Sequence, residues 1–305
     1  MAFAIDGFDL HGFVAATLAE GDIRYQSSLQ DALTHGTFDA AIVASPPEYH
    51  VEQACACLSA GLNVMVEKPL STSLASAAKV AEAAEAAGRA ALVGQNFRFI
   101  AREHHVHKAL PAIGGLVGGT ISSARPAEIA RPHVRADPFG PLWDISLHHL
   151  DTLRMRFGLP CSVVGRMRPL PSGRDGHIVY ELELTWSNGA RIQYQHSEGA
   201  PGFHHLEYLE GRDGVITVDD QRVTLAPSHR RARRLFALRI PDPHDVLLDR
   251  LAEVALGKSP RELSARENLA TVALAEAASQ AMAEERVVQL SDVIDRAEVA
   301  TGNVA

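Results

Sequence analysis

The stretch DAAIVASPPEYHVEQACACLSAGLNVMVEKPL, residues 39–70, decides the fold class of this chain. It holds two short and continuous apolar runs, at 40–45 and 63–67, and between them a helical stretch at 48–61 that ends in glycine. Continuous rather than alternating apolarity is typical of parallel strands that are covered on both faces. The stretch therefore predicts a strand–helix–strand unit with short connections.

The same alternation of strands and helices extends outward in both directions. Further strands are expected at residues 3–5 and 90–94, and further helices at 27–36 and 72–88. The last of these helices is predicted to begin after an N-cap, Ser73, and to end at a C-cap, Gly88. Repeated strand–helix units predict an α/β fold with a doubly wound parallel sheet over residues 1–97.

The pattern changes after residue 97, and we expect a second domain over residues 98–305. Its helices are expected at about 102–112, 142–158, 243–257 and 265–285, with one strand at 116–124 and several between 161 and 227. Val179, Glu181 and Glu183 alternate with Tyr180, Leu182 and Leu184. One solvent-exposed face and one buried face indicate an open antiparallel sheet, so this domain is predicted to be α+β.

Composition narrows the possible functions. Apolar residues make up 46% and charged residues 22%, which is typical of a globular protein, and the net charge of −8 argues against a nucleic-acid partner. The basic run at 230–234 is expected to be a solvated hairpin or loop. Three cysteines are too few for a disulfide framework, and neither a signal peptide nor a membrane span is recognisable. We expect a soluble, cytoplasmic protein without a membrane partner.

Polar loops follow three of the predicted parallel strands. ASPPEYH follows the strand at 40–44, EKP the strand at 63–66 and GQNFRF the strand at 90–93. Ligands of open parallel sheets bind outside the carboxyl ends of the strands, so these loops are expected to meet at one edge. An exposed ion pair at a strand end would also explain EKP taken alone.

A second group of polar residues lies on the helix expected at 142–158. Asp144, His148 and Asp151 recur at spacings of four and three, which places them on one helical face. A carboxylate one turn from a histidine can fix its tautomer and raise its basicity. A satisfied polar cluster between helix and sheet is the alternative. His149 projects about 100° away and is either a substrate contact or a core residue.

Four segments together resemble the Gfo/Idh/MocA oxidoreductases, which include glucose–fructose oxidoreductase and inositol dehydrogenases. They are the opening stretch, ALVGQNFRF, LWDISLHHLD and ENLATVALAEAASQAMAEERVVQL, and they occur in family-like order over about residues 3–292. The resemblance implies a Rossmann domain followed by a domain with an open sheet. It also implies NAD(P)-dependent hydride transfer between nicotinamide and a hydroxyl or carbonyl of a sugar, inositol or related polyol.

The resemblance assigns the site residues. Lys68 matches the lysine that lies between nicotinamide and substrate, and Asp144 and His148 match the D-x-x-x-H pair, so these three are the expected catalytic residues. Whether Lys68 or His148 accepts the proton stays open. The expected cofactor-binding residues are Asp6, Ser45, Pro46, Pro47, His50, Glu67, Lys68, Pro69, Gln95, Asn96 and Arg98.

The sequence departs from the family at its beginning, because no G-x-G-x-x-G turn is found. The favoured alignment treats FAID, residues 3–6, as the second strand of the family fold, which leaves the first strand and the glycine-rich turn absent. Asp6 then takes the place of the acid that binds the ribose and favours NAD over NADP. The alternative keeps residues 2–5 as a first strand with a degenerate turn. A cofactor-deficient ligand-binding or regulatory protein, a fragment of a longer dehydrogenase, and an interaction protein are the competing functions.

Metal binding is not expected. The histidines at 104–107 and 204–205 lack the accompanying carboxylate or cysteine spacing of a metal site. In the loop at 125–141, Arg131, His133 and Arg135 either hold substrate or are solvated charges. We further expect a small sugar or polyol substrate, and a homo-oligomer that assembles through the C-terminal sheet.

Overall fold

The structure is a computed structural model that describes residues 2–5, 23–26, 28–35, 38–126, 137–169, 177–220, 222–235, 240–258 and 261–301. It forms two compact units. The first comprises Met1–Gly94 and Leu247–Leu269, and the second comprises Gln95–Val246 and Ala270–Ala305. The first division lies at Gly94, close to the boundary predicted at residue 97, and the segment Leu247–Leu269 belongs to the first unit.

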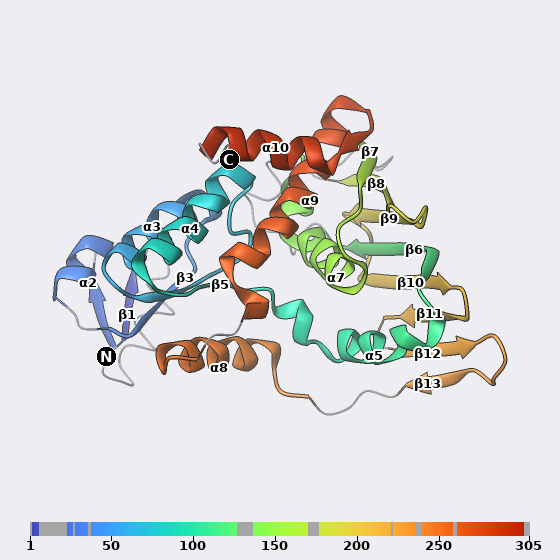
Figure 1. Cartoon of the computed structure of the whole chain (residues 1–305), viewed down its shortest axis with the longest axis horizontal. Coiled ribbons are helices and arrows are strands. Elements are labelled where there is room, and N and C mark those ends of the chain that lie inside the picture. Colours follow the sequence, from blue (N-terminus) through green and yellow to red (C-terminus); the bar gives the residue numbers. More distant parts are fainter. Residues whose placement is uncertain are drawn as a thin grey trace. The chain divides into compact units, whose positions relative to one another are not determined.

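A three-stranded parallel sheet forms the centre of the first unit. It consists of β3 (Ala40–Val43), β4 (Asn63–Val66) and β5 (Ala91–Val93), with β4 in the middle. Figure 1 labels the two outer strands, β3 and β5. Every residue of β4 is buried, as its continuous apolar run predicts. Val43, Val66 and Val93 are register partners across the sheet. The three strands therefore end side by side.

Two helices cover this sheet and pack against each other. They are α3 (Pro47–Ser59) and α4 (Leu74–Ala87). The predicted caps of α4 are confirmed, because the Ser73 side chain accepts a hydrogen bond from the Ser76 backbone and Gly88 adopts φ 60°. Only a glycine takes up that left-handed conformation without strain. The first unit thus has the predicted strand–helix alternation.

A separate pair of parallel strands precedes this sheet. β1 (Ala2–Ile5) pairs with β2 (Ile23–Gln26), and α2 (Leu29–His35) follows. Within the described residues, no hydrogen-bonded strand connects this pair to β3. In the doubly wound order 3-2-1-4-5-6 the second and third strands are neighbours and the first lies between the second and the fourth. A neighbouring parallel pair suits the second and third strands of this order and equally the first and second, so the assignment of FAID to the second strand stays a prediction.

A nine-stranded sheet forms the second unit, in the order β13-β12-β11-β10-β6-β9-β8-β7-β14. Its strands are β6 (Leu116–Arg125), β7 (Ser162–Pro169), β8 (Ile178–Thr185), β9 (Arg191–Glu198), β10 (His204–Gly211), β11 (Gly214–Asp219), β12 (Arg222–Pro227), β13 (Arg233–Leu235) and β14 (Val288–Gln289). The predicted open sheet is confirmed, but it is mixed, because β6 and β9 run parallel. Sequence patterning could not reveal that pairing, since it joins segments that are distant in the chain.

The two faces of this sheet differ as predicted. Tyr180, Leu182 and Leu184 are buried, whereas Glu181 and Glu183 on the other face are partly exposed. Val179 is an exception, because it is buried although its place in the alternation predicted a wet position. The dry face packs against α5 (Ala101–Ala109) and α7 (Leu147–Phe157), which Figure 1 shows beside the sheet.

The end of the chain contains one helix more than expected. α8 (Pro243–Ala255) and α9 (Ala265–Glu284) match the prediction, but α10 (Leu290–Thr301) follows them, so the prediction of two closing helices was wrong. Leu290 and Val293 bury one face of α10 at a spacing of three. None of the described helices has the length and apolarity needed to cross a membrane.

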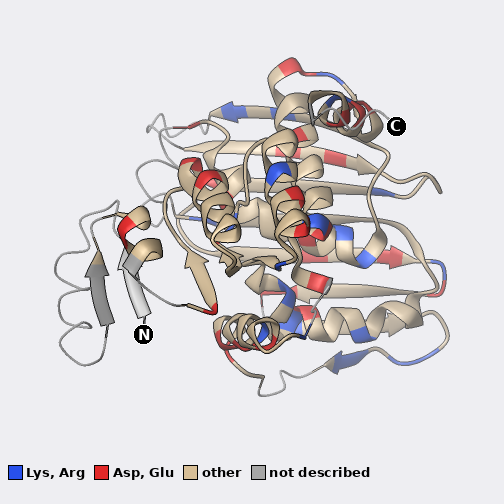
Figure 2. Ribbon diagram, turned by 60° about the vertical axis from the view of Figure 1, so that its left-hand side comes forward, with Lys and Arg blue, Asp and Glu red and all other residues tan. Residues whose placement is uncertain are grey.

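The basic run at 230–234 lies on the hairpin of β12 and β13 (Figure 2). Its side chains are exposed. The prediction of a solvated hairpin is therefore confirmed. Cys55, Cys57 and Cys161 are free thiols, of which Cys57 is buried, Cys55 is partly buried and Cys161 is exposed. Burial raises the pKa of the Cys57 thiol to about 11, which keeps it protonated and unreactive.

Candidate functional site

The EKP segment begins where β4 ends. The Glu67 backbone N–H donates to Val43 O at 2.8 Å, and the Gly94 N–H donates to Val66 O at 2.8 Å. These bonds extend the ladder by one residue, so Glu67 and Gly94 lie at the same edge as the end of β3. Lys68, the next residue, is half-buried. The expectation that these strand ends meet at one edge is confirmed for β3, β4 and β5.

Glu67 packs closely against the neighbouring strand end. Its Oε2 accepts a hydrogen bond of 3.2 Å from the Lys68 backbone N–H. A Cβ added to Gly94 would lie 3.4 Å from the Glu67 carboxylate, which is an ordinary van der Waals contact. Glu67 is therefore placed beside the backbone of the predicted catalytic lysine.

His50 connects two of the loops at this edge. It is 1% exposed; its Nδ1 lies 2.7 Å from Pro69 O and its Nε2 lies 2.8 Å from Ser45 O. A neutral imidazole can donate to only one of these carbonyls, whereas an imidazolium can donate to both. Ser45 in turn donates from Oγ to Gln53 Oε1 at 2.8 Å. His50 thus braces the loop after β3 against the loop after β4.

In the second unit, the helix expected at 142–158 does not begin as an α-helix. Its first part, η4 (Leu142–Ser146), is π-helical, and α7 begins at Leu147. The prediction that Asp144, His148 and Asp151 share one helical face assumed α-helical geometry throughout. A π-helical turn has more residues per turn, so it changes the direction of Asp144 relative to the other two. π-Helical turns of this kind occur often at functional sites.

The two histidines at the start of α7 are both buried. The His148 ring stacks on Phe97, with centroids 4.1 Å apart and planes at 10°. His149 Nδ1 lies 2.9 Å from the Tyr194 hydroxyl. Burial and, secondarily, the nearby His205 lower the pKa of His149 well below its ordinary value, so this ring is neutral. The structure shows that His149 is a buried, hydrogen-bonded residue that also lines a cavity.

The carboxylates of Asp144 and Asp151 bind different arginines. Asp144 Oδ2 accepts from Arg125 Nη1 at 2.8 Å. Asp151, which is 1% exposed, accepts from Arg98 Nε at 2.6 Å and from Arg98 Nη2 at 2.7 Å. The structure therefore divides the predicted cluster into two ion pairs. Arg98, an expected cofactor contact, has its guanidinium engaged in the second of them.

Arg125 and Glu198 are site residues that the sequence did not indicate. Arg125 Nε donates to both carboxylate oxygens of Glu198, at 3.0 and 2.8 Å, while Nη1 reaches Asp144. Glu198 lies on β9, 73 residues away from Arg125 in the chain. No motif or local spacing carries information about a pairing at that separation.

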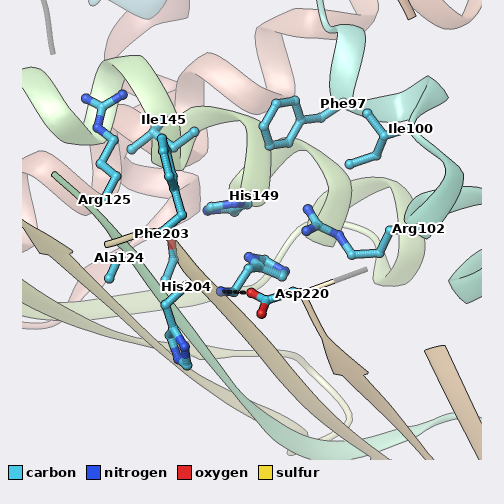
Figure 3. Close-up of a pocket in the computed structure, with 12 residues that line it drawn as sticks. Phe97, Ile100, Arg102, Ala124, Arg125, Ile145, His149, Phe203, His204 and Asp220 are labelled. Atoms are coloured by element: carbon cyan, nitrogen blue, oxygen red, sulfur yellow. Dashed lines mark hydrogen bonds between the residues drawn. The ribbon is translucent and has the colours of Figure 1, made fainter. Parts of the chain in front are cut away.

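A cavity of about 560 Å³ lies within the second unit. Figure 3 shows Phe97, Arg102, His149 and Phe203 around it, and Arg125 also lines it. The lining combines apolar and aromatic side chains with several polar and charged ones, and the volume suits a ligand of sugar size. The expected substrate-loop residues Arg131, His133 and Arg135 lie outside the described residues, as does Asp6.

The residues present fit the nicotinamide end of a dinucleotide better than its phosphates. The amide nitrogen and oxygen of Gln95 are buried and have no hydrogen-bond partner among the described residues, so both remain available to a polar ligand. Ser45 and Lys68 lie at the strand ends, while the sequence holds no G-x-G-x-x-G turn for the pyrophosphate. No group of three or more histidines, cysteines or acids suited to a metal is found in the described part of the chain.

Comparison with known proteins agrees with this geometry. Residues 14–95 match the family described as an oxidoreductase family with an NAD-binding Rossmann fold. The scyllo-inositol 2-dehydrogenase (NADP(+)) of Bacillus subtilis is 25% identical, with 79% of this chain and 76% of the relative covered. The match to an NAD-binding domain supports NAD or NADP as the cofactor class.

Two solved structures share the fold. An oxidoreductase of Agrobacterium radiobacter in complex with NAD+, L-tartaric acid and magnesium is 20% identical, with a TM-score of 0.80 over 95% of this chain and 91% of that one. A myo-inositol dehydrogenase candidate of Sinorhizobium meliloti is 21% identical, with a TM-score of 0.77 over 95% and 92%. Residues 14–95 thus resemble the NAD-binding domain of the Gfo/Idh/MocA oxidoreductases, and the relatives at 25% identity and below share the fold of the whole chain.

Proposed function

We propose that this protein is an NAD(P)-dependent oxidoreductase that acts on a CH–OH group of a sugar, inositol or related polyol. The observation that carries the proposal is Lys68, which follows a fully buried parallel strand at the edge where open α/β sheets bind ligands. The inositol dehydrogenase among the relatives supports the substrate class.

The proposed mechanism assigns a role to each of three side chains. Nicotinamide, when bound, supplies the hydride acceptor for alcohol oxidation. The Lys68 ammonium stabilises the negative charge that develops on the substrate oxygen. His148, whose ring plane is fixed by Phe97, accepts or relays the hydroxyl proton. Asp144 supplies the negative charge that favours a protonated histidine.

Titration with NADH and NADPH tests the cofactor assignment. We expect saturable binding of at least one dinucleotide below millimolar concentration, with NADH preferred because Asp6 would accept from the ribose hydroxyls. Nicotinamide fluorescence measures the binding, and Asp6→Ser is expected to reduce the preference for NADH. Absence of binding of either dinucleotide at millimolar concentration would contradict the proposal and favour a cofactor-deficient ligand-binding protein.

A screen of sugars, inositols and their acids then identifies the substrate. Reduction of NAD or NADP at 340 nm reports turnover. We expect activity within this group and not with simple aliphatic alcohols, which lack the hydroxyls that a polar site can bind.

His50→Ala tests the brace between the Ser45 and Pro69 loops. We expect turnover on the confirmed substrate to fall by up to about 10²-fold, because a displacement of about 1 Å at a catalytic group has that effect. His50→Gln, which keeps one hydrogen bond to a carbonyl, is expected to retain more activity than alanine. Equal activity of all three proteins would show that the brace does not position Lys68.

We also propose a homo-oligomer that assembles through the open face of the C-terminal sheet. Leu206 and Tyr208 on β10 are 39% and 42% exposed, and Val117 on β6 is 48% exposed. Apolar side chains exposed on a sheet face are typical of a protein interface. Sedimentation of Tyr208→Glu should show a smaller species than wild type, whereas an unchanged species would place the interface elsewhere.

A further inference from the structure

Arg125 joins two carboxylates that differ in their exposure to solvent. Its Nε binds Glu198, whose side chain is 1% exposed, and its Nη1 binds Asp144, whose side chain is 28% exposed. The two planar arms of the guanidinium are fixed relative to each other. Because the Glu198 contact sets the plane of the guanidinium, it also sets the direction in which Nη1 meets Asp144.

Glu198 also contacts a histidine, which in turn contacts a serine. His196 Nε2 lies 2.9 Å from Glu198 Oε2, and Ser123 Oγ lies 3.1 Å from His196 Nδ1. Burial lowers the pKa of His196 and outweighs the opposing effect of Glu198, so the ring is neutral. An ionised carboxylate can only accept, so Nε2 carries the hydrogen and donates, and Nδ1 accepts from the serine.

The parallel pairing of β6 and β9 builds this chain of contacts. Ser123 is the register partner of His196, and Arg125 is the register partner of Glu198. Side chains two residues apart on a strand lie on the same face, so the four groups form one buried row. Arg125 is the last residue of this row, and it also binds Asp144, which lies outside the sheet. A rigid sheet therefore supports the carboxylate at the start of the helix that carries His148.

Electrostatics favours the same arrangement. Burial lowers the pKa of Arg125, but the hydrogen bonds and charges of Glu198, followed by those of Asp144, outweigh it and leave the pKa raised. Arg125 is therefore charged at physiological pH. A fixed positive charge 2.8 Å from Oδ2 favours the ionised form of Asp144.

We propose that Arg125 is a positioning residue, which holds the Asp144 carboxylate in one place and in its ionised form. The inference rests on the proposed function, in which Asp144 supports the proton-accepting histidine. A purely structural role, in which Arg125 only neutralises buried Glu198, is the competing explanation.

The test compares two buried arginines. Arg125→Lys keeps the charge and loses the planar arms, and Arg125→Met loses both. Arg156 is the matched control: its side chain is 3% exposed, and it binds Glu103 and Glu207 rather than Asp144. Arg156→Lys and Arg156→Met make the same two changes at a similar buried ion pair.

Two readouts are measured on the full chain. The first is the pH titration of ¹³C-labelled aspartate, with the Asp144 signal assigned by Asp144→Asn; it requires neither cofactor nor substrate. The second is the pH profile of kcat/KM on the confirmed substrate. We expect Arg125→Met to move the midpoint of the Asp144 titration to higher pH, and with it the acidic side of the kcat/KM profile. We also expect it to lower kcat by about 10²-fold. Arg125→Lys should lower kcat with a smaller shift in pH.

The outcomes separate the two proposals. If the Arg125 and Arg156 variants lose stability alike and neither moves the Asp144 midpoint, Arg125 is only structural and the inference is overturned. If wild type shows no turnover on any substrate, the proposed function fails, and the Asp144 titration alone decides whether Arg125 holds that carboxylate. A shifted midpoint in Arg125→Met, but not in Arg156→Met, supports the inference.

Discussion

Lys68→Ala is expected to lower turnover by about two to four orders of magnitude, which is the usual contribution of a positioned acid–base or electrostatic group. The lysine follows buried β4 and is half-buried at the edge formed by three strand ends. Removing its ammonium leaves the developing alkoxide charge without a fixed partner. The measurement is kcat on the confirmed substrate, together with the affinity for the cofactor.

Two further variants sharpen this prediction. Lys79→Ala removes an exposed lysine from α4 in the same unit and is expected to leave turnover unchanged. Lys68→Arg keeps the positive charge, but a guanidinium does not give up its proton at working pH. Partial activity in Lys68→Arg would assign an electrostatic role to Lys68 and leave proton transfer to His148. Activity as low as that of the alanine variant would favour Lys68 as the proton acceptor, and near-wild-type rates in Lys68→Ala would remove it from the mechanism.

The elements that were predicted correctly are those with a local cause. β4 is buried along its length, and its continuous apolar run already shows that both faces are covered. The caps of α4 follow from Ser73 and Gly88, whose side-chain chemistry acts within one turn. The shared edge of the strand ends could be predicted because parallel strands linked by helices must end on the same side.

The partners of the site residues could not be predicted in the same way. Arg98 and Asp151 are 53 residues apart, and Arg125 and Glu198 are 73 apart. Their pairing depends on the parallel contact of β6 with β9 and on the packing of α7, and neither has a sequence period. The π-helical turn at Asp144 was missed for a related reason, because a spacing of four suits an unbroken α-helix equally well.

Asp151→Ala is expected to destabilise the protein by about 3 to 5 kcal/mol, the cost of leaving a buried charge without its partner. The Arg98 side chain is 2% exposed and Asp151 is 1% exposed, and Thr271 and Arg154 also donate to this carboxylate. Asp151→Ala removes the carboxylate that accepts two hydrogen bonds from the buried guanidinium of Arg98. Urea unfolding followed by circular dichroism measures the change in the free energy of unfolding.

A surface pair provides the matched control. Arg266 binds Glu85 through Nε and Nη2, at 2.9 and 2.7 Å, in the same two-armed geometry, but the Glu85 side chain is 61% exposed. Glu85→Ala should therefore change the free energy of unfolding by no more than about 1 kcal/mol. Similar losses in both variants would show that burial does not set the cost. The double variant Arg98→Met with Asp151→Leu should be more stable than Asp151→Ala, because it removes the buried Arg98 charge together with the Asp151 carboxylate.

The pH dependence has a definite sign. Burial raises the pKa of Asp151, but the hydrogen bonds and charge of Arg98 outweigh it, so the folded pKa is lowered below its ordinary value. A carboxyl with a depressed folded pKa contributes stability that is present above the unfolded pKa of about 3.9 and is lost as pH falls through the folded pKa. The difference between wild type and Asp151→Ala should be constant from neutral pH to about pH 5 and should shrink below about pH 4. A difference that grew on acidification would show that Asp151 is protonated in the folded protein.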